Sequence, residues 1–373
     1  METCDCLVVG GGPAGSSCAR ELVRSGLDVL VLDKAVFPRD KVCAGWITPA
    51  VVGELDLDLA DYRSERTLQP ITGFRTGLLE GPTISTGYGH AVSYGIRRCE
   101  FDHYLLERSG ARLRLGEPLE SLRRDENQWV VNDSIRTPVL IGAGGHFCPV
   151  ARALCDGERD EAGVVVAQEI EFEMSSDEAA ACKVEPEVPE LYFCEDLRGY
   201  AWCFRKGDFL NIGLGREGET RLSALVAAFC ESLQRHERVP ANAQTRFHGH
   251  AYRLYRGRPR RANADGVLLV GDAAGLAYPQ SGEGIRPAIE SGMMAARVII
   301  KAAGDYRQAV LDDLQRQIAA RYGRTNARPR RRALVPDSWR QGVARRLLAT
   351  NWFTRHVVIN RWFLHAHQAP LPP

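Results

Sequence analysis

The sequence has no long apolar run, no CxxC pair of cysteines and no excess of one charge. No stretch approaches the roughly 18 uninterrupted apolar residues of a membrane-spanning helix. The eleven cysteines lie scattered without CxxC spacing, which argues against a disulfide framework and a zinc site. The formal net charge is only +1. These absences predict a cytoplasmic protein with free thiols and no metal.

Catalytic signatures of other enzyme classes are also missing. There is no GxSxG segment, and the HxH pairs at 248–250 and 365–367 have no acid or cysteine set beside them. The first strand begins at residue 3, so we expect no cleaved presequence. With 373 residues, 45% hydrophobic and 25% charged, the composition is that of a globular protein with about two domains.

The most informative segment joins a short apolar strand to a glycine turn. Residues 7–9 are apolar, the turn carries Gly10, Gly12 and Gly15, and a second apolar run ends at Asp33. Gly10 permits the tight turn, Gly12 allows a pyrophosphate to approach the backbone, and Gly15 lets the helix pack on the strand. Asp33 would accept a hydrogen bond from a ribose hydroxyl. The pattern predicts a dinucleotide site.

Two further apolar strands, at 139–141 and 267–270, also stop at glycine turns. The nucleotide-binding domain is therefore expected to be discontinuous, over residues 1–72, 97–162 and 263–305. Residues 73–96, read as an antiparallel hairpin, and 163–262, with a helix at 222–234, predict a sheet-based substrate domain. A helix is expected at 284–303, and residues 306–373 form a helical C-terminal region. The predicted fold class is α/β, with a Rossmann-like domain interleaved with an α+β substrate domain.

These motifs, in this order, resemble the flavoprotein hydroxylase superfamily that includes para-hydroxybenzoate hydroxylase, over roughly residues 3–305. The family's GADGxxSxVAR appears at 142–152, and its GDAAGxxxPxxGEGI at 271–285. The geranylgeranyl reductase branch fits best, because residues 37–43 (FPRDKVC) are similar to its FPRxKxC and residues 200–204 (YAWCF) to its YxWxFP. Residues 98–102 (RCEFD) are similar to the RxxFD whose arginine reaches the flavin.

The resemblance implies FAD as the cofactor, with the second glycine turn and the third motif completing the site. The third motif would direct the start of a helix towards the flavin ring, where free amides favour the negative charge of reduced flavin. The implied cofactor residues are Gly10, Gly12, Pro13, Ala14, Gly15, Asp33, Lys34, Lys41, Cys43, Ala44, Arg98, Gly142, Ala143, Gly144, Gly271, Asp272, Pro279, Gly282, Gly284 and Ile285. Asp272 alone would also suit a helix-capping acid.

Two departures from the family pattern matter for function. Gly144 stands where the hydroxylases have an aspartate that helps bind flavin and the nicotinamide donor, so the electron donor is either NAD(P)H or a reduced protein carrier. Arg205 replaces the proline of YxWxFP. It either places a cation at a cavity entrance or belongs to a solvated turn.

Cys43 matches a cysteine that lies beside the flavin in the reductases. Its thiol either donates a proton to the carbanion left by hydride transfer or packs as a small hydrophobe. Tyr200, Trp202 and Phe204 alternate, so in a strand they share one face. The resemblance favours an apolar cavity wall for the substrate over plain core packing.

The C-terminal tail is basic and aromatic. Residues 321–373 hold eleven arginines and one acid, Asp337, together with Trp339, Trp352 and Trp362. Such an amphipathic helix suits peripheral contact with the inner face of a membrane. The alternative is a helical cap on the substrate domain, with arginines on its wet face. No nucleic-acid recognition fold accompanies the basic run.

The resemblance implies reduction of a carbon–carbon double bond in an apolar substrate, with hydride from reduced flavin and a proton from Cys43 or water. A monooxygenase that hydroxylates or epoxidises its substrate is the main alternative. A halogenase ranks lower because Tyr200 and Phe204 replace the outer residues of its usual WxWxI segment. A non-catalytic flavin-binding protein is the third reading.

Overall fold

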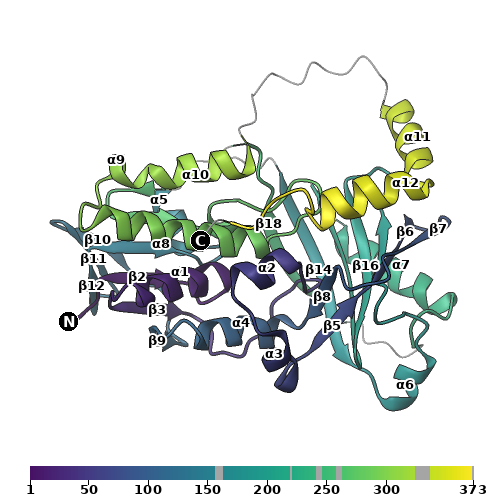
Figure 1. Cartoon of the computed structure of the whole chain (residues 1–373), viewed down its shortest axis with the longest axis horizontal. Coiled ribbons are helices and arrows are strands. Elements are labelled where there is room, and N and C mark those ends of the chain that lie inside the picture. Colours follow the sequence, from purple (N-terminus) through teal and green to yellow (C-terminus); the bar gives the residue numbers. More distant parts are fainter. Residues whose placement is uncertain (156–162, 219–220, 241–245, 258–262, 324–336, 372–373) are drawn as a thin grey trace. The chain divides into compact units, whose positions relative to one another are not determined.

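The computed structural model describes residues 1–155, 163–218, 221–240, 246–257, 263–323 and 337–371. The chain forms two compact units, each assembled from separated segments (Figure 1). Unit 1 comprises Met1–Asp40, Cys99–Gly163 and Tyr252–Arg328. Unit 2 comprises Lys41–Arg98, Val164–Ala251 and Pro329–Pro373. The predicted mixed α/β fold class is confirmed.

The unit boundaries differ from the expected domain boundaries, most extensively at residues 41–72 and 306–328. Residues 41–72 belong to unit 2, because β4 (Trp46–Ile47) and β5 (Leu68–Ile71) pair with β8 (Ser93–Ile96). Residues 306–328 belong to unit 1, where α10 (Asp313–Tyr322) packs on α8 (Ile285–Ala302). The division of labour between a cofactor domain and a substrate domain stays a prediction.

The main sheet of unit 1 is parallel except for one edge strand. Its order is β19 (Asn263–Ala264), β20 (Val267–Leu269), β13 (Val139–Gly142), β2 (Cys6–Val9), β3 (Val29–Asp33) and β9 (Arg112–Leu115). Strands β2, β13 and β20 are fully buried, as apolar strands covered on both faces must be. Val9 pairs with Gly142, and Gly142 with Leu269. The glycine turns after these strands therefore leave the sheet side by side.

Three helices of unit 1 follow the glycine turns: α1 (Pro13–Arg24), α5 (Pro149–Leu154) and α8. Unit 1 also contains most of α4 (Arg98–Glu107), α9 (Gln308–Leu311) and α10. Figure 1 shows α8 between α1 and α10. A Cβ on Gly292 of α8 would lie 2.2 Å from the carbonyl oxygen of Ala14, so only glycine allows α1 and α8 to approach this closely. The helix expected at 284–303 is confirmed.

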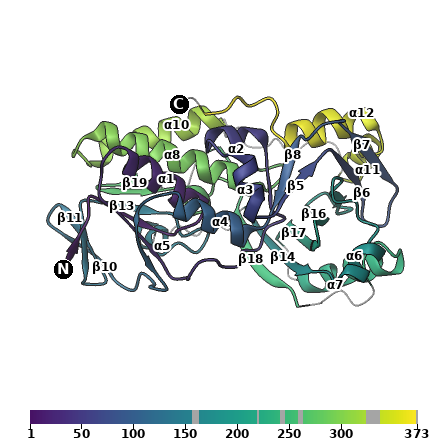
Figure 2. The same cartoon turned by 60° about the horizontal axis from the view of Figure 1, so that its bottom comes forward.

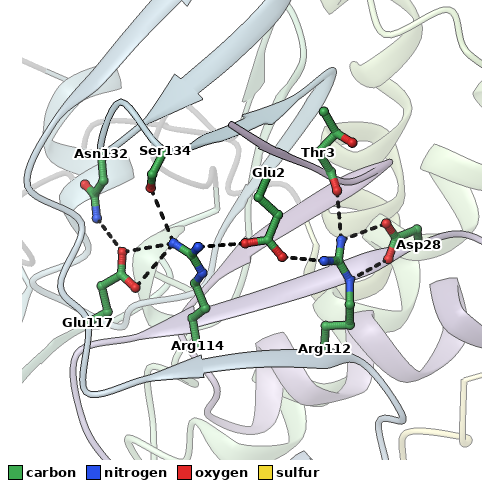
Figure 3. Close-up of polar contacts among 8 residues, drawn as sticks. All are labelled: Glu2, Thr3, Asp28, Arg112, Arg114, Glu117, Asn132 and Ser134. Carbon is green, nitrogen blue, oxygen red and sulfur yellow. Dashed lines mark hydrogen bonds and ion pairs between the residues drawn. The ribbon is translucent and has the colours of Figure 1, made fainter.

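A second sheet in unit 1 has the order β1 (Glu2–Thr3), β12 (Ile135–Thr137), β11 (Gln128–Val131) and β10 (Leu122–Asp125). Arginines of β9 hold its first strand (Figure 3). The Arg112 guanidinium donates to the Asp28 carboxylate at 2.9 and 2.7 Å and to the Thr3 carbonyl at 2.8 Å. Glu2 pairs with both Arg112 and Arg114. These contacts fasten the N-terminal strand to the main sheet.

Unit 2 is built on a mixed sheet. Its order is β18 (His248–Arg253), β14 (Val164–Glu173), β17 (Phe209–Glu217), β16 (Gly199–Lys206), β15 (Glu190–Phe193), β6 (Gly73–Leu78) and β7 (Thr83–Gly87). Helices α6 (Ser176–Ala181) and α7 (Leu222–Arg235) lie along one side (Figure 2). Ile170, Phe172, Ala201, Cys203 and Ile212 form the core on that face. The helix expected at 222–234 is confirmed.

The hairpin expected at 73–96 is confirmed only for its first two strands, because β6 and β7 pair antiparallel. Strand β8 instead lies between β4 and β5, and both of its edges are therefore occupied. Short helices α2 (Pro49–Glu54) and α3 (Leu59–Glu65) complete this part of unit 2. The tail forms α11 (Asp337–Leu348), α12 (Asn351–Phe353) and a π-helical segment, Thr354–Phe363. Across the described ranges, we find no helix with both the length and the apolar character needed to cross a membrane.

Candidate functional site

The turn between β2 and α1 has the geometry that its glycines predict. Gly10 has a φ of +114°, and a Cβ there would lie 2.5 Å from the carbonyl of Ala143. A Cβ on Gly15 would lie 1.9 Å from the Gly10 carbonyl oxygen. Gly12 caps α1 without a side chain, and the first turn carries no acid. The positive end of α1 is therefore open to an anion.

Asp33 ends β3 and is bonded to the same turn. Its Oδ2 accepts the Gly11 amide at 2.7 Å, and its Oδ1 accepts the Ala35 amide at 2.9 Å. The carboxylate is half-buried, and each oxygen retains a lone pair for a hydroxyl donor. Lys34, which the sequence also assigned to the cofactor, is exposed.

The second motif follows β13, next to the first glycine turn. A Cβ on Gly142 would lie 2.5 Å from the Leu269 side chain, so the strand needs glycine there. Gly144 occupies the aspartate position of the hydroxylases, and a Cβ on it would lie 3.3 Å from the Cys148 Cα. This spacing is tight, because it lies below ordinary van der Waals contact.

The third motif lies at the end of β20 and at the start of α8. Asp272 sits in the short 3-10 helix Gly271–Ala273, and its Oδ1 is 3.2 Å from where a Cβ on Gly284 would be. Gly282 has a φ of +68°, and its Cβ would lie 2.3 Å from the Tyr252 hydroxyl oxygen. Gly282 thus needs glycine, and at Gly284, the N-cap of α8, a Cβ would crowd the Asp272 carboxylate.

An ion pair that the sequence did not predict links two of the motifs. Arg39 Nη2 lies 3.2 Å from Asp102 Oδ2, and the Asp102 side chain is fully buried. The Arg39 guanidinium also lies 4.6 Å from the Phe37 ring centroid. A Cβ on Gly12 would be 3.4 Å from Arg39 Nη2, so this cation faces the first glycine turn. Arg39 belongs to the FPRDKVC motif and Asp102 to the RCEFD motif. The presence of both motifs is the signal that could have revealed the pair.

The residues of unit 1 fit FAD. Two helix N-termini without first-turn acids suit a pyrophosphate, and two carboxylates at strand ends suit hydroxyl groups. The predicted cofactor residues in unit 1 are Gly10, Gly12, Pro13, Ala14, Gly15, Asp33, Lys34, Gly142, Ala143, Gly144, Gly271, Asp272, Pro279, Gly282, Gly284 and Ile285. Those in unit 2 are Lys41, Cys43, Ala44 and Arg98. Their individual roles as FAD ligands stay predictions.

The face of the unit 2 sheet opposite α6 and α7 is aromatic. Phe204 stacks on Trp46 with ring centroids 5.0 Å apart, and Phe363 of the tail packs at 5.6 Å from Trp46 and 5.3 Å from Tyr200. Phe204 is 1% exposed and Trp202 5% exposed, while Tyr200 is half-buried. The alternation predicted for these three aromatics therefore places them on one face. Their role in binding substrate stays a prediction.

Trp202 lies flat over a glycine of the neighbouring strand. It pairs with Gly213, where a Cβ would lie 2.3 Å from the indole ring. The indole Nε1 donates to Asn211 Oδ1 at 2.7 Å. Asn211 Nδ2 in turn donates to the Cys43 carbonyl at 3.3 Å. The residue that carries the candidate thiol is thus bonded to the aromatic face.

Two basic residues have different surroundings from those the motifs suggested. Lys41 Nζ lies 2.6 Å from His250 Nε2, and since an ammonium only donates, the imidazole nitrogen accepts. Arg205 donates to the carbonyls of Ala179 and Gly207, at 2.8 and 2.9 Å. Because Ala179 belongs to α6, Arg205 lies on the face opposite the aromatics. Arg205 is a residue of β16 that bonds the turn at Gly207, and it does not place its charge on the aromatic face.

Buried charges beside the aromatics were missed by sequence reasoning. Lys206 Nζ donates to Glu171 Oε1 at 2.7 Å, and Arg97 Nε lies 3.5 Å from Glu171 Oε2. Burial favours the neutral form of Glu171, but the Lys206 charge and hydrogen bond outweigh it and lower its pKa. Acids at 169 and 171 that alternate with Ile170 and Phe172 were the available signal.

Residues 3–324 match the model of a protein family described as an FAD binding domain. The chain is 32% identical over 364 residues to a menaquinone reductase of Mycobacterium tuberculosis, covering 90% of this chain and 84% of the relative. It is 26% identical to a digeranylgeranylglycerophospholipid reductase of Methanocaldococcus jannaschii, covering 84% and 81%.

A solved structure shares the fold. It is a geranylgeranyl bacteriochlorophyll reductase-like protein of Thermoplasma acidophilum, with a TM-score of 0.73 and 23% identity over 96% of this chain and 91% of that chain. FAD is therefore the cofactor, and the chain is an FAD-dependent oxidoreductase. The chain belongs to the FAD-binding family of the flavoprotein hydroxylase superfamily, in its geranylgeranyl reductase-like branch.

Proposed function

We propose that this protein reduces a carbon–carbon double bond in an apolar, isoprenoid-type substrate. Relatives are named for menaquinone and for digeranylgeranylglycerophospholipid, and both names denote molecules with isoprenoid chains. An aromatic face in unit 2 suits such a chain, because it offers apolar area with few polar groups. This is the chemistry that the reductase branch of the family implies.

One observation carries the proposal. Asn211 bonds the Cys43 carbonyl and the Trp202 indole at the same time. A thiol-bearing residue is thereby held next to aromatic side chains suited to an unsaturated hydrocarbon. A residue that served only as core filler would not need this polar link to a loop.

When bound, FAD supplies the hydride in its reduced form. The hydride forms a C–H bond at one carbon, and the electron pair of the double bond takes a proton at the other carbon. Cys43 is the proposed donor of that proton, with water as the alternative. The Cys43 sulfur accepts the Gly45 amide at 3.4 Å, an interaction that stabilises the thiolate left behind. Solvent then returns the proton to the thiolate.

The choice of electron donor depends on Gly144 rather than on Cys43. Gly144 lacks the carboxylate with which the hydroxylases bind a nicotinamide donor. Reducing equivalents therefore reach the flavin from NAD(P)H bound without that group or from a reduced protein carrier. Anaerobic mixing with NADH, NADPH and reduced ferredoxin separates these sources by the rate of flavin bleaching.

The tail supports peripheral contact with a membrane. Val343, Leu347 and Trp352 are 54%, 41% and 68% exposed, although neighbouring tail residues are buried against unit 2. Arg346 is exposed beside them, and residues 338–373 contain no acid. Apolar side chains flanked by arginines suit a bilayer with anionic headgroups. The tail thus caps unit 2 with one face and presents the other to lipid.

The proposed function is tested by anaerobic single turnover. The holoenzyme is reduced with dithionite and mixed with geranylgeranyl lipids that carry no quinone, and flavin reoxidation is followed by absorbance together with loss of a double bond in the lipid. We expect reoxidation by at least one of these, slowed about tenfold or more in Cys43→Ala. Cys99→Ala, the other half-buried cysteine, is the matched control. If reduced flavin is reoxidised by oxygen alone, the reductase proposal is wrong.

A further inference from the structure

The aromatic face of unit 2 contains a cluster of buried polar side chains. It consists of Glu169, Glu171, Lys206 and Asn211. Glu169 is 6% exposed, while Lys206 and Asn211 are each 1% exposed. Buried charges of this kind are costly unless they are paired, so their retention beside a candidate site calls for a role.

Strand register explains how the cluster forms. Gly213 pairs with Glu169 on one side and Trp202 on the other, and Asn211 pairs in the same way with Glu171. These side chains alternate with the core residues of the opposite face, so they project together. The network is therefore a property of the sheet rather than of a mobile loop.

The orientation of the Asn211 amide is fixed by its neighbours. Trp202 Nε1 can only donate, so the oxygen of the Asn211 side chain must face it. The Asn211 nitrogen is then directed at the Cys43 carbonyl and at Glu171 Oε1, each at 3.3 Å. One side chain thus connects the aromatic face, the buried charges and the Cys43 backbone.

The other polar group of the Cys43 backbone, its amide, favours the ionised form of the Glu169 carboxyl and so opposes the rise in pKa that burial causes there. Two residues further on, Gly45 has a φ of +70°, and a Cβ there would lie 2.6 Å from Lys206 Nζ. The Gly45 carbonyl accepts the Ile96 amide at 2.9 Å. The segment that carries the thiol is therefore fixed on both sides.

We propose that Glu169 and Asn211 are positioning residues that hold the Cys43 backbone from both sides and thereby set how the thiol is presented. This deepens the role of Cys43 in the proposed function. The charged groups around Glu169 are Lys206 and Glu171, with Arg97 on the far side of Glu171. Lys206 and Arg97 both form ion pairs with Glu171. The charged form of Glu169 is stabilised mainly by the Cys43 backbone, the more distant charge of Lys206 and Asn211.

The electrostatics of Glu169 support this assignment. Burial raises the pKa of Glu169 to about 7, despite the opposing effects of the Cys43 amide and Lys206. Its Oε2 has no hydrogen-bond partner within the described part of the chain. Glu171 stays ionised over the same range, because its pKa is lowered. Glu169 is therefore the member of the cluster that changes charge near neutral pH.

The test measures alkylation of Cys43 in the full-length holoenzyme with iodoacetamide, from pH 5.5 to 9, by quantifying the modified peptide. In the wild type we expect an inflection near pH 7 in addition to thiol ionisation, and in Glu169→Gln we expect thiol ionisation alone. Asn211→Ala should alkylate about fivefold faster or more, since one anchor of the backbone is lost. Cys99 in the same samples reports general unfolding.

Glu173→Gln is the matched control, because Glu173 ends the same strand but is exposed. It should leave the profile unchanged. The proposal is overturned if the wild-type and Glu169→Gln profiles coincide, or if Asn211→Ala alkylates within twofold of wild type. Glu169→Gln keeps the shape of the side chain, and flavin content verifies folding. Alkylation needs no substrate, so failure of the reductase proposal would leave this result standing.

Discussion

The guanidinium of Arg39 lies 3.2 Å from the carboxylate of Asp102, and this ion pair joins two sequence motifs that are distant in the chain. Asp102 is fully buried, whereas the Arg39 side chain is 20% exposed. The buried partner is thus neutralised by a cation that also faces the glycine turn at Gly12. One arginine thus pairs with a buried acid of unit 1 and also faces its first glycine turn.

Replacing Arg39 should therefore affect both stability and cofactor binding. We expect Arg39→Ala to lower the free energy of unfolding by about 2 kcal/mol, less than the 3–5 kcal/mol of a fully buried broken pair because Arg39 is partly exposed. FAD affinity should fall about tenfold, since a cation near the pyrophosphate is lost. Urea denaturation and flavin titration measure the two effects. Arg24→Ala on the exposed side of α1 should change neither.

Adding one methyl group under Trp202 should disturb the aromatic face. In Gly213→Ala the new Cβ would overlap the indole, so we expect a loss of about 2–3 kcal/mol of stability and a red-shifted tryptophan emission. Gly215→Ala on the same strand is the control, because its Cβ would have ordinary contact at 3.4 Å with Ala167. Equal stability of the two variants would contradict the packing of Trp202 on Gly213.

The raised pKa of Glu169 predicts a pH dependence of stability. Between the unfolded value near 4.5 and the folded value of about 7, the folded state binds more protons than the unfolded state. Stability attributable to Glu169 is therefore present at pH 4 and lost as the pH rises through 7. Between pH 5 and pH 8, the wild type should lose about 2–3 kcal/mol relative to Glu169→Gln. Parallel stability curves for the two proteins would refute the shift.

The exposed face of the tail should bind lipid. We expect the protein to sediment with vesicles of phosphatidylglycerol but not with phosphatidylcholine, and salt should weaken the binding. Leu347→Ser with Trp352→Ser should reduce binding about tenfold or more, because both side chains are exposed and apolar. Ile300→Ser, an exposed apolar position in unit 1, is the control. Unchanged sedimentation of the double variant would leave the tail as a cap only.

Local rules made the glycine motifs predictable from sequence. The turn at Gly10 and the helix starting at Pro13 follow from steric limits that act within a few residues. Apolar runs such as 267–270 predicted buried parallel strands for the same reason. These predictions needed no knowledge of distant contacts.

The polar cluster could not be predicted, because it depends on register between strands that are far apart in sequence. Asn211 meets Cys43 across 168 residues, and Lys206 meets Glu171 across 35. The wrong assignment of β8 has a similar origin, since its partners β4 and β5 precede the hairpin that seemed to contain it. Phe363 packs on Trp46 through the same kind of long-range contact.

The central claim is double-bond reduction, and product analysis tests it most directly. The holoenzyme is supplied with reductant and an unsaturated isoprenoid lipid, with and without ¹⁸O₂, and the lipid is examined by mass spectrometry. The account predicts a product that gains two hydrogens per reduced bond, formed equally well without oxygen. A product that carries ¹⁸O, formed only when oxygen is present, would contradict it and establish a monooxygenase.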